Sequence, residues 1–334
     1  MLGREKQRGG YGLEATIDSA IAQVATLADG LRASVGQVIV GKESAIDLLL
    51  TALLAEGHVL LEDVPGVGKT TLAKALARSL ACTFQRLQFT PDLLPSDIVG
   101  VTVYNQKTGD FERHPGPIFT NILLADEINR AGPRTQSALL EAMEERQVSV
   151  EGVTAPLPRP FLVLATQNPI EQEGTFPLPE AQLDRFLVRL NIGYPTEAEE
   201  RDILRRFKEG SPLADLAPVA DAAQLVAMQR AVRQVHVSPA VESYILAIVR
   251  ASREHPLLEL GGSPRASLAL YRTGQARAAM QGRAFVLPDD IKFMAAAVLA
   301  HRLVRSGRSR LRGRDSLAIV GELVEQTPVP VEQA

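Results

Sequence analysis

The sequence predicts an α/β domain with a central parallel sheet and helices on both faces, followed by a smaller all-helical domain. Up to about residue 194, short apolar segments alternate with helical patterns, as strands and crossover helices do in a parallel sheet. From residue 195 onward, nearly every segment has the periodicity of a helix. Thr196 and Glu199 have the spacing of a capping box and predict the first helix of this second part.

The expected domains follow from these patterns. Residues 1–13 are polar and rich in glycine, and we expect a disordered N-terminal tail there. The α/β core then spans residues 14–194, and the helical domain spans residues 195–334. Within the core, residues 43–57 have helical periodicity and end at a glycine. Residues 58–62 (HVLLE) are the first expected strand, which leads directly into a glycine-rich loop.

Strands and helices alternate along the rest of the core. Apolar segments predict strands at residues 84–89, 121–127, 161–168 and 186–192. Helical patterns occupy residues 70–81 and 135–147 of the core and residues 238–255 and 288–304 of the second domain. Ser238 followed by Pro239 predicts a helix start. Residues 105–110 (NQKTGD) predict the turn of a hairpin.

Composition and charge exclude several classes of protein. With 334 residues, 46% of them apolar and 22% charged, the chain is of the globular type. A net charge of −3 gives no field that would draw the whole protein to DNA or anionic lipid. The single cysteine, Cys82, cannot form an intrachain disulfide, and the longest apolar run, residues 45–55, is too short to span a bilayer. No signal peptide is recognisable, so we expect a cytoplasmic protein without membrane insertion.

A phosphate-binding loop follows the first expected strand. It matches the pattern G-x-x-x-x-G-K-[ST] except at the first position, where Asp63 replaces glycine; we expect Asp63 to shape the turn, since Asp tolerates left-handed backbone. Gly66 and Gly68 let backbone N–H groups turn toward phosphate oxygens. Lys69 is expected to reach the β- and γ-phosphates, and Thr70 to offer its hydroxyl to Mg²⁺. The residues expected to bind nucleotide in this loop are Asp63, Val64, Pro65, Gly66, Val67, Gly68, Lys69, Thr70 and Thr71.

Two acidic residues, Asp126 and Glu127, end a buried strand of the same sheet. Asp126 is expected to hold Mg²⁺ through water, and Glu127 to polarise an attacking water molecule. A small-molecule kinase would need an acceptor hydroxyl here, so the acidic pair favours hydrolysis. Asn168 ends another strand, where its amide can orient that water. No guanine-reading N-K-x-D follows the acidic strand, so GTP is not the expected nucleotide.

The order of these motifs resembles that of the AAA+ ATPases. Five longer segments are similar to the MoxR family of that superfamily, and the likeness covers about residues 15–315. These segments are residues 87–100 (LQFTPDLLPSDIVG), 123–152 (beginning LLADEINRAGP), 165–186 (beginning ATQNPIEQEG), 261–270 (GGSPRASLAL) and 289–303 (beginning DDIKFMAAA). The resemblance implies an AAA+ P-loop domain followed by a small helical lid, with ATP and Mg²⁺ as cofactors.

The resemblance also implies roles for individual residues. The catalytic residues expected on this basis are Lys69 (Walker A), Glu127 (Walker B), Asn168 (sensor 1), Arg265 (sensor 2) and Arg185 (arginine finger). Thr70 and Asp126 are the expected metal-holding residues. Arg130 is the alternative for the finger, which would act on a neighbouring subunit. Val40 and Gly41 lie in residues 38–43 (VIVGKE), which match the segment that packs on adenine.

By the same likeness, the chain is expected to assemble with copies of itself, usually as a hexameric ring. Two inserts would project from the ring face: a helix-2 insert at about residues 90–120 and a pre-sensor-1 hairpin at about residues 147–160. The implied activity is Mg²⁺-dependent ATP hydrolysis by a chaperone-like remodeler or maturation factor for a client protein. The usual partner in this family is a protein with a von Willebrand factor A domain.

Three other functions stay open from sequence alone. One is the motor subunit of a magnesium-chelatase-like metal-insertion complex, and another is a binding module that holds ATP as a switch. The third is a nucleic-acid translocase; residues 147–156 carry one acidic residue and no Lys or Arg, which counts against it. Residues 301–314 contain six arginines that suit nucleic acid, an acidic partner or the next subunit.

Overall fold

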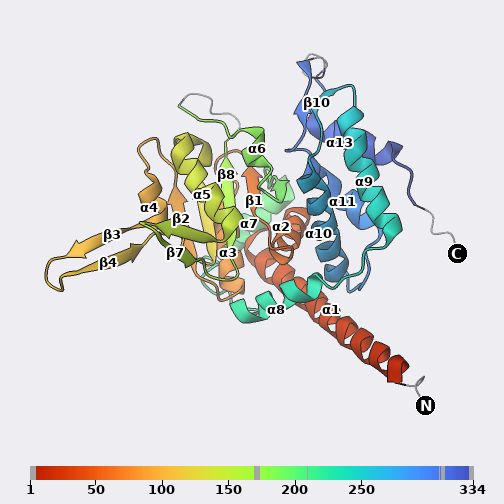
Figure 1. The fold of residues 1–334 in the computed structure, drawn as a ribbon, viewed down its shortest axis with the longest axis horizontal. Coiled ribbons are helices and arrows are strands. Elements are labelled where there is room, and N and C mark those ends of the chain that lie inside the picture. Colours follow the sequence, from red (N-terminus) through yellow and green to blue (C-terminus); the bar gives the residue numbers. More distant parts are fainter. Residues whose placement is uncertain (1–4, 169–173, 209, 308, 310–312, 331–334) are drawn as a thin grey trace. The chain divides into compact units, whose positions relative to one another are not determined.

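The computed structural model describes residues 5–168, 174–208, 210–307, 309 and 313–330 (Figure 1), with side chains from residue 17 onward. The helices and strands up to the acidic pair are α1 (Glu5–Val38), α2 (Glu43–Leu54), β1 (Val59–Glu62), α3 (Lys69–Ser79), β2 (Phe84–Gln88), α4 (Pro95–Val99), β3 (Gly100–Asn105), β4 (Asp110–Pro115) and β5 (Ile122–Asp126). Those that follow are a 3-10 turn η1 (Ile128–Arg130), α5 (Pro133–Glu145), β6 (Gln147–Val150), β7 (Val153–Pro156), β8 (Leu162–Gln167), α6 (Glu180–Leu183), β9 (Val188–Leu190), α7 (Glu197–Phe207), α8 (Ala222–Val232), α9 (Pro239–Glu254), β10 (Leu258–Leu260), α10 (Pro264–Met280), α11 (Pro288–Leu299), β11 (Val304–Arg305) and α13 (Ser316–Gln326).

A five-stranded sheet is the centre of the α/β part, and its strands run in the order β2-β5-β8-β1-β9. All its pairings are parallel, which confirms the predicted sheet. Every residue of β5 is buried, as expected for a central strand covered on both faces. Because parallel strands end at the same edge, the loop after β1 and the ends of β5 and β8 come together there.

Helices cover both faces of this sheet. On one face, Leu123 of β5 and Val163 of β8 belong to a buried cluster with Leu139 and Met143 of α5. Helix α3 contacts β2 and β5, and none of its residues belongs to that cluster, so it covers the opposite face. Because both faces of the sheet are packed, the site at its edge has a rigid base.

Both predicted hairpins are present. Strands β3 and β4 pair antiparallel from Gly100↔Pro115 to Asn105↔Asp110, so residues 105–110 form the predicted turn. Figure 1 shows this pair as a narrow ribbon that extends away from the sheet. Strands β6 and β7 form the second hairpin. The rings of Tyr104 and Phe111 lie 5.3 Å apart on the first hairpin, with Phe111 73% exposed, so the ribbon presents an aromatic pair to solvent.

The chain forms two compact units: an α/β unit of Arg32–Leu49 and Glu56–Ala222, and a helical unit of Met1–Leu31, Leu50–Ala55 and Ala223–Ala334. The predicted boundary at residue 194 does not coincide with this division, because residues 195–222 belong to the α/β unit. Arg206 of α7 donates to the carbonyl oxygen of Gly36 at 2.8 Å, and the backbone N–H of Val219 donates to the carbonyl oxygen of Ser79 at 2.7 Å. These hydrogen bonds attach the segment to the α/β unit.

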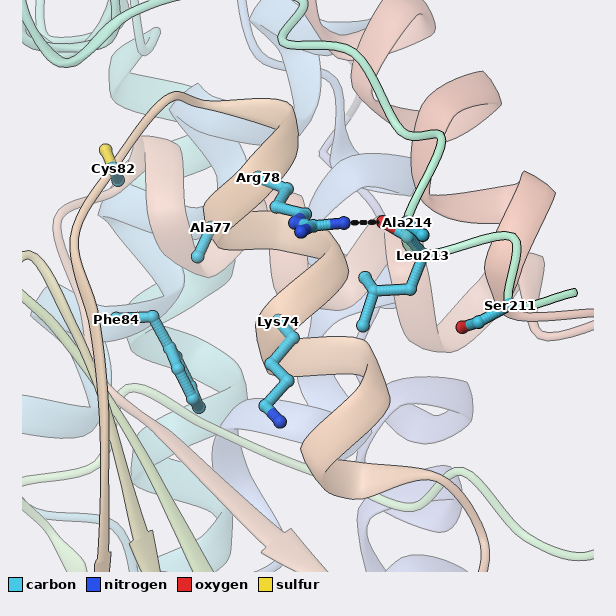
Figure 2. Close-up of a pocket in the computed structure, with 8 residues that line it drawn as sticks. All are labelled: Lys74, Ala77, Arg78, Cys82, Phe84, Ser211, Leu213 and Ala214. Atoms are coloured by element: carbon cyan, nitrogen blue, oxygen red, sulfur yellow. Dashed lines mark hydrogen bonds between the residues drawn. The ribbon is translucent and has the colours of Figure 1, made fainter.

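Figure 2 shows the same attachment at the outer side of α3. Arg78 donates to the carbonyl oxygen of Leu213, and a pocket of about 420 Å³ lies between α3 and this segment. Cys82 lines the pocket. Burial, assisted by the negative charge of Asp221, raises the pKa of the Cys82 thiol to about 11.

The helical unit contains α9, α10, α11 and α13, with the antiparallel pair β10–β11 beside them. Ser238 caps α9 and Pro239 is its first residue, as predicted. Arg283 donates to both oxygens of Asp290, at 2.9 and 2.6 Å, which ties the α10–α11 connection to the start of α11. None of the helices in the described part of the chain has the length and apolar character that a bilayer span needs.

The N-terminus differs from the expectation. Helix α1 begins at Glu5, inside the segment 1–13 that was expected to be disordered; residues 1–4 lie outside the described residues. Glycines and polar residues in this stretch favour disorder on composition alone, yet the backbone continues the helix of the apolar residues after them. Ile21, Val24 and Ala28, at helical spacing, are each buried to 1% exposure or less.

Candidate active site

The loop between β1 and α3 has the geometry of an anion site. Gly66 and Gly68 have φ angles of 86° and 95°, which favour glycine, and Gly68 directly precedes the first residue of α3. The first N–H groups of α3 therefore point toward the loop, where the helix dipole favours negative charge. The Lys69 ammonium donates to the carbonyl oxygens of Asp63 and Val64 at 2.8 and 3.2 Å, which holds this cation beside the loop.

Asp63 has a different role from the one expected. It is not among the residues with positive φ, so left-handed backbone does not explain its presence. The residue is 7% exposed, and its carboxylate accepts hydrogen bonds from the backbone N–H groups of Ile192 and Gly193, the latter at 3.0 Å. Asp63 therefore fastens the entrance of the loop to the segment after β9.

The carboxylate of Asp126 at the end of β5 is held through both of its oxygens. Thr166 of β8 donates to Oδ1 at 2.6 Å. Arg86 of β2 donates to Oδ2 from Nε at 3.0 Å and from Nη2 at 2.6 Å. Thr166 also accepts the backbone N–H of Glu127 at 2.8 Å, so one hydroxyl connects the two acidic residues.

Glu127 has φ 57° and ψ 50°, a left-handed conformation that is uncommon for a residue with a side chain. This conformation ends β5 and starts η1, turning the carboxylate away from the strand direction. Its Oε2 accepts from Gln88 Nε2 at 2.9 Å and pairs with Arg130 Nε at 2.8 Å. Two donors from different elements thus set the direction of this side chain.

These groups line one pocket of about 380 Å³. Its lining residues are Pro65, Gly66, Gly68, Lys69, Thr70, Thr71, Arg86, Asp126, Glu127, Thr166 and Asn168. The structure therefore brings together the loop, the acidic pair and Asn168, which sequence reasoning had placed on separate strands. Thr70 and Asp126 offer oxygen atoms that can coordinate a metal ion. Among the described residues, no cluster of three His, Cys, Asp or Glu side chains suggests another metal centre. One hydroxyl and one carboxylate suit Mg²⁺, which binds through few protein ligands and substrate phosphates.

A second, mostly apolar pocket of about 190 Å³ shares Gly66, Gly68 and Thr71 with the first. Its other lining residues are Val38, Ile39, Val40, Lys42, Val67, Ile192, Gly193, Pro195, Ile203 and Phe207. Apolar walls next to a phosphate site are suited to a planar base. Val40 lines this pocket, whereas Gly41 does not.

Lys42 and Gly41 lie against the start of α7 and the residues just before it. Lys42 donates to the carbonyl oxygen of Tyr194 at 2.9 Å and pairs with Glu199 at 3.3 Å. The backbone N–H of Thr196, and then Lys42, lower the pKa of Glu199. Gly41 has φ 67°, and a Cβ there would lie 2.0 Å from Glu199 Oε1, so a side chain would strain the backbone and displace Glu199. The predicted capping box of Thr196 and Glu199 is present.

The predicted arginines lie outside the phosphate pocket. Arg185 precedes β9 and pairs with Glu144 of α5 at 3.0 Å, and Arg130 pairs with Glu127. Arg265 lies in the first turn of α10, in the helical unit. Sequence reasoning missed Arg86, Gln88 and Thr166. Arg86 and Gln88 are two residues apart on one strand, so they share a face, and that spacing was the available signal.

Comparisons with known proteins agree with this geometry. A family profile described as "ATPase family associated with various cellular activities (AAA)" matches residues 58–188, and one described as an AAA lid domain matches residues 250–319. YeaC of Bacillus subtilis, described as uncharacterized, is 51% identical over 90% of this chain and 94% of its own length. Chaperone MoxR1 of Mycobacterium tuberculosis is 45% identical over 81% of this chain and 74% of its own length.

A solved structure is also similar, that of a candidate ATPase from Cytophaga hutchinsonii. It has a TM-score of 0.89 and 37% identity, and the match covers 96% of this chain and 99% of the other. The chain is therefore a member of the MoxR family of AAA+ ATPases, and it is an ATP-hydrolysing enzyme.

Proposed function

We propose that this ATPase hydrolyses ATP in the pocket between α3 and β5, with Mg²⁺ held by Thr70 and Asp126. The observation that carries the proposal is the position of Glu127: its carboxylate lines the same pocket as Lys69 and Thr70. The N-terminus of α3 and Lys69 bind the phosphates. The metal, when bound, neutralises phosphate charge. The neighbouring apolar pocket takes the adenine ring, with Val40 as one of its walls.

In this proposal, Glu127 takes the proton from the attacking water, and Asn168 holds that water in place. Gln88 and Arg130 direct the carboxylate of Glu127, because Gln88 donates to Oε2 and Arg130 pairs with the same oxygen. Arg265 senses the nucleotide from the helical lid. Arg185 completes a neighbouring subunit's site, so the active form is an assembled ring, proposed as a hexamer.

We extend the proposal to chaperone-like remodelling of a client protein. Support comes from the relative named Chaperone MoxR1 and from the two hairpins, of which β3–β4 carries the exposed pair Tyr104 and Phe111. Such a ribbon suits contact with a partly apolar protein surface. The expected partner, a protein with a von Willebrand factor A domain, rests on family resemblance.

The test is Glu127→Gln. We expect nucleotide binding to persist, while kcat falls by about 100-fold or more, because the amide cannot accept the proton of the water. Nucleotide affinity is measured with a fluorescent ATP analogue, and turnover by phosphate release. Glu141→Gln, at an exposed glutamate of α5, is the matched control and should retain turnover. Normal turnover by Glu127→Gln would mean that another group activates the water.

A further inference from the structure

Arg86 connects the two acidic side chains of the site: it contacts Asp126 directly and Glu127 through Gln88. Its Nε and Nη2 donate to Asp126 Oδ2, and the same Nη2 donates to Gln88 Oε1 at 2.9 Å. The amide of Gln88 in turn donates from Nε2 to Glu127 Oε2 at 2.9 Å. Because Thr166 joins Asp126 Oδ1 to the backbone N–H of Glu127, these hydrogen bonds close into a ring.

The chemistry of the groups determines which group donates in each hydrogen bond from Asp126 through Arg86 and Gln88 to Glu127. A guanidinium can only donate and a carboxylate can only accept, so an amide placed between them has one fitting orientation. Its oxygen must face Arg86 and its NH₂ group must face Glu127. Without Arg86, the amide oxygen of Gln88 loses its donor, and the single hydrogen bond to Glu127 leaves the side chain of Gln88 less restrained.

Charge and burial give the same residue a second effect. The side chain of Asp126 is 12% exposed, whereas that of Arg86 is 48% exposed. A carboxylate this buried is costly without a compensating cation. Arg86 therefore differs from an ordinary surface partner, because its loss leaves a buried charge rather than a solvated one.

We propose that Arg86 is a positioning residue for ATP hydrolysis, which orients Glu127 through Gln88 while it compensates Asp126. This inference rests on the proposed role of Glu127 as the group that activates water. Arg86 does not touch the reacting water in this scheme. It determines how the amide next to the carboxylate is turned, and so the fraction of time that Glu127 points toward its substrate.

The first test is a double-mutant cycle on kcat with Arg86→Met and Gln88→Ala. Arg86→Met alone should lower kcat about tenfold, with KM for ATP changed less than about threefold, since the phosphate-binding groups remain. In the Gln88→Ala background, Arg86→Met should lower kcat less than about twofold, because the intermediary is already missing. A full tenfold loss in that background would overturn action through Gln88.

The second test needs no turnover. It uses thermal unfolding in EDTA without nucleotide and compares Arg86→Met, Arg86→Lys and Arg189→Met. Arg189 of β9 pairs with Glu62 of β1 at 3.0 Å, so it is a matched ion pair on the same sheet outside the phosphate pocket. Arg86→Met should lower the midpoint by about 5 °C, because Asp126 loses its cation. Arg86→Lys keeps the cation and should recover most of that loss.

Equal midpoints for Arg86→Met and Arg189→Met would overturn the compensation of Asp126. Failure of the inference alone has a distinct signature: wild type hydrolyses ATP, Glu127→Gln does not, and Arg86→Met turns over like wild type. If instead Glu127→Gln turns over normally, the proposed water-activating role fails first, and the inference about its positioning fails with it.

Discussion

Asp63 shows how one residue can depart from a motif and still serve the same loop. The pattern favours glycine at this position, yet the carboxylate of Asp63 holds the N–H groups of Ile192 and Gly193. We predict that Asp63→Gly, which restores the general pattern, lowers the free energy of unfolding by about 2–4 kcal/mol, the loss of two charge-assisted hydrogen bonds at a buried site. Urea unfolding measures the difference.

Asp63→Asn is the matched control, because its side-chain oxygen can still accept one of these hydrogen bonds. Its loss of stability should be smaller than that of Asp63→Gly. Nucleotide affinity should follow the same order, since Gly193 also lines the apolar pocket. An Asp63→Gly protein as stable as wild type would mean that the contact to the segment after β9 contributes little.

At this scale, the sequence predicts residues whose chemistry is confined to a short motif. Lys69, Thr70, Asp126 and Glu127 are found that way, and the pocket contains all of them. Arg86 and Thr166 escaped notice because their partner lies far along the chain: both contact Asp126, 40 residues away. A lone arginine on a strand is ordinarily solvated, and its partner is known only when the strands are paired.

His58 lies directly before β1 and connects this strand to β8 and α5 through hydrogen bonds. Its Nδ1 accepts the N–H of Val163 on β8, and its Nε2 donates to the carbonyl oxygen of Met143 on α5. Burial first, and then the positive charge of Arg146, lower the pKa of His58 to about 4. The folded protein therefore holds this ring neutral at ordinary pH.

This arrangement predicts a loss of stability on acidification. In the unfolded chain His58 takes up its proton near pH 6.5, whereas in the fold it does so near pH 4. Between these values the unfolded chain binds more protons, so the contribution of neutral His58 is complete above pH 6.5 and is lost as the pH falls toward 4. The loss is on the order of 3 kcal/mol.

Urea unfolding at several pH values measures this effect. His58→Asn keeps an acceptor for the N–H of Val163 and does not titrate, so its curve should be flatter than that of wild type between pH 6.5 and 4. Carboxyl groups that titrate in the same range are common to both proteins and cancel in the comparison. Parallel curves would show that His58 is protonated in the fold.

Elements were predictable where a local signal defines both ends. The turn NQKTGD predicted the β3–β4 hairpin, and the caps Thr196 and Ser238 predicted where α7 and α9 begin. Membership of a unit was less predictable. Helix α7 has ordinary helical periodicity, but Arg206 and Lys42 attach it to residues more than 150 positions earlier in the sequence. Periodicity contains no information about such contacts.

At the scale of the whole molecule, the proposed shared site gives a complementation prediction. Lys69→Ala subunits lack the phosphate-binding ammonium but keep Arg185, whereas Arg185→Ala subunits have the opposite defect. Each protein alone should be nearly inactive. If Arg185 acts on a neighbour, mixing equal amounts should restore up to about a quarter of wild-type activity, the chance that a junction in a mixed ring has both intact parts.

Phosphate release against mixing ratio measures this recovery. Each variant alone, at the same total protein concentration, is the control. If mixtures of Lys69→Ala and Arg185→Ala stay inactive while an affinity tag on one variant co-purifies the other, Arg185 does not act in trans, and Arg130 becomes the residue to test. The ion pair between Arg185 and Glu144 would then be a structural contact within one chain.

The weakly acidic thiol of Cys82 has a practical consequence for studying movement. Maleimides and similar probes react with thiolates, and at neutral pH a thiol with a pKa of about 11 supplies very little of that form. The natural chain should therefore show little unwanted labelling at Cys82 when a second cysteine is introduced for a probe. A fluorophore attached through Lys107→Cys, at the turn of the β3–β4 ribbon, would follow that ribbon through the ATP cycle without replacement of the native cysteine.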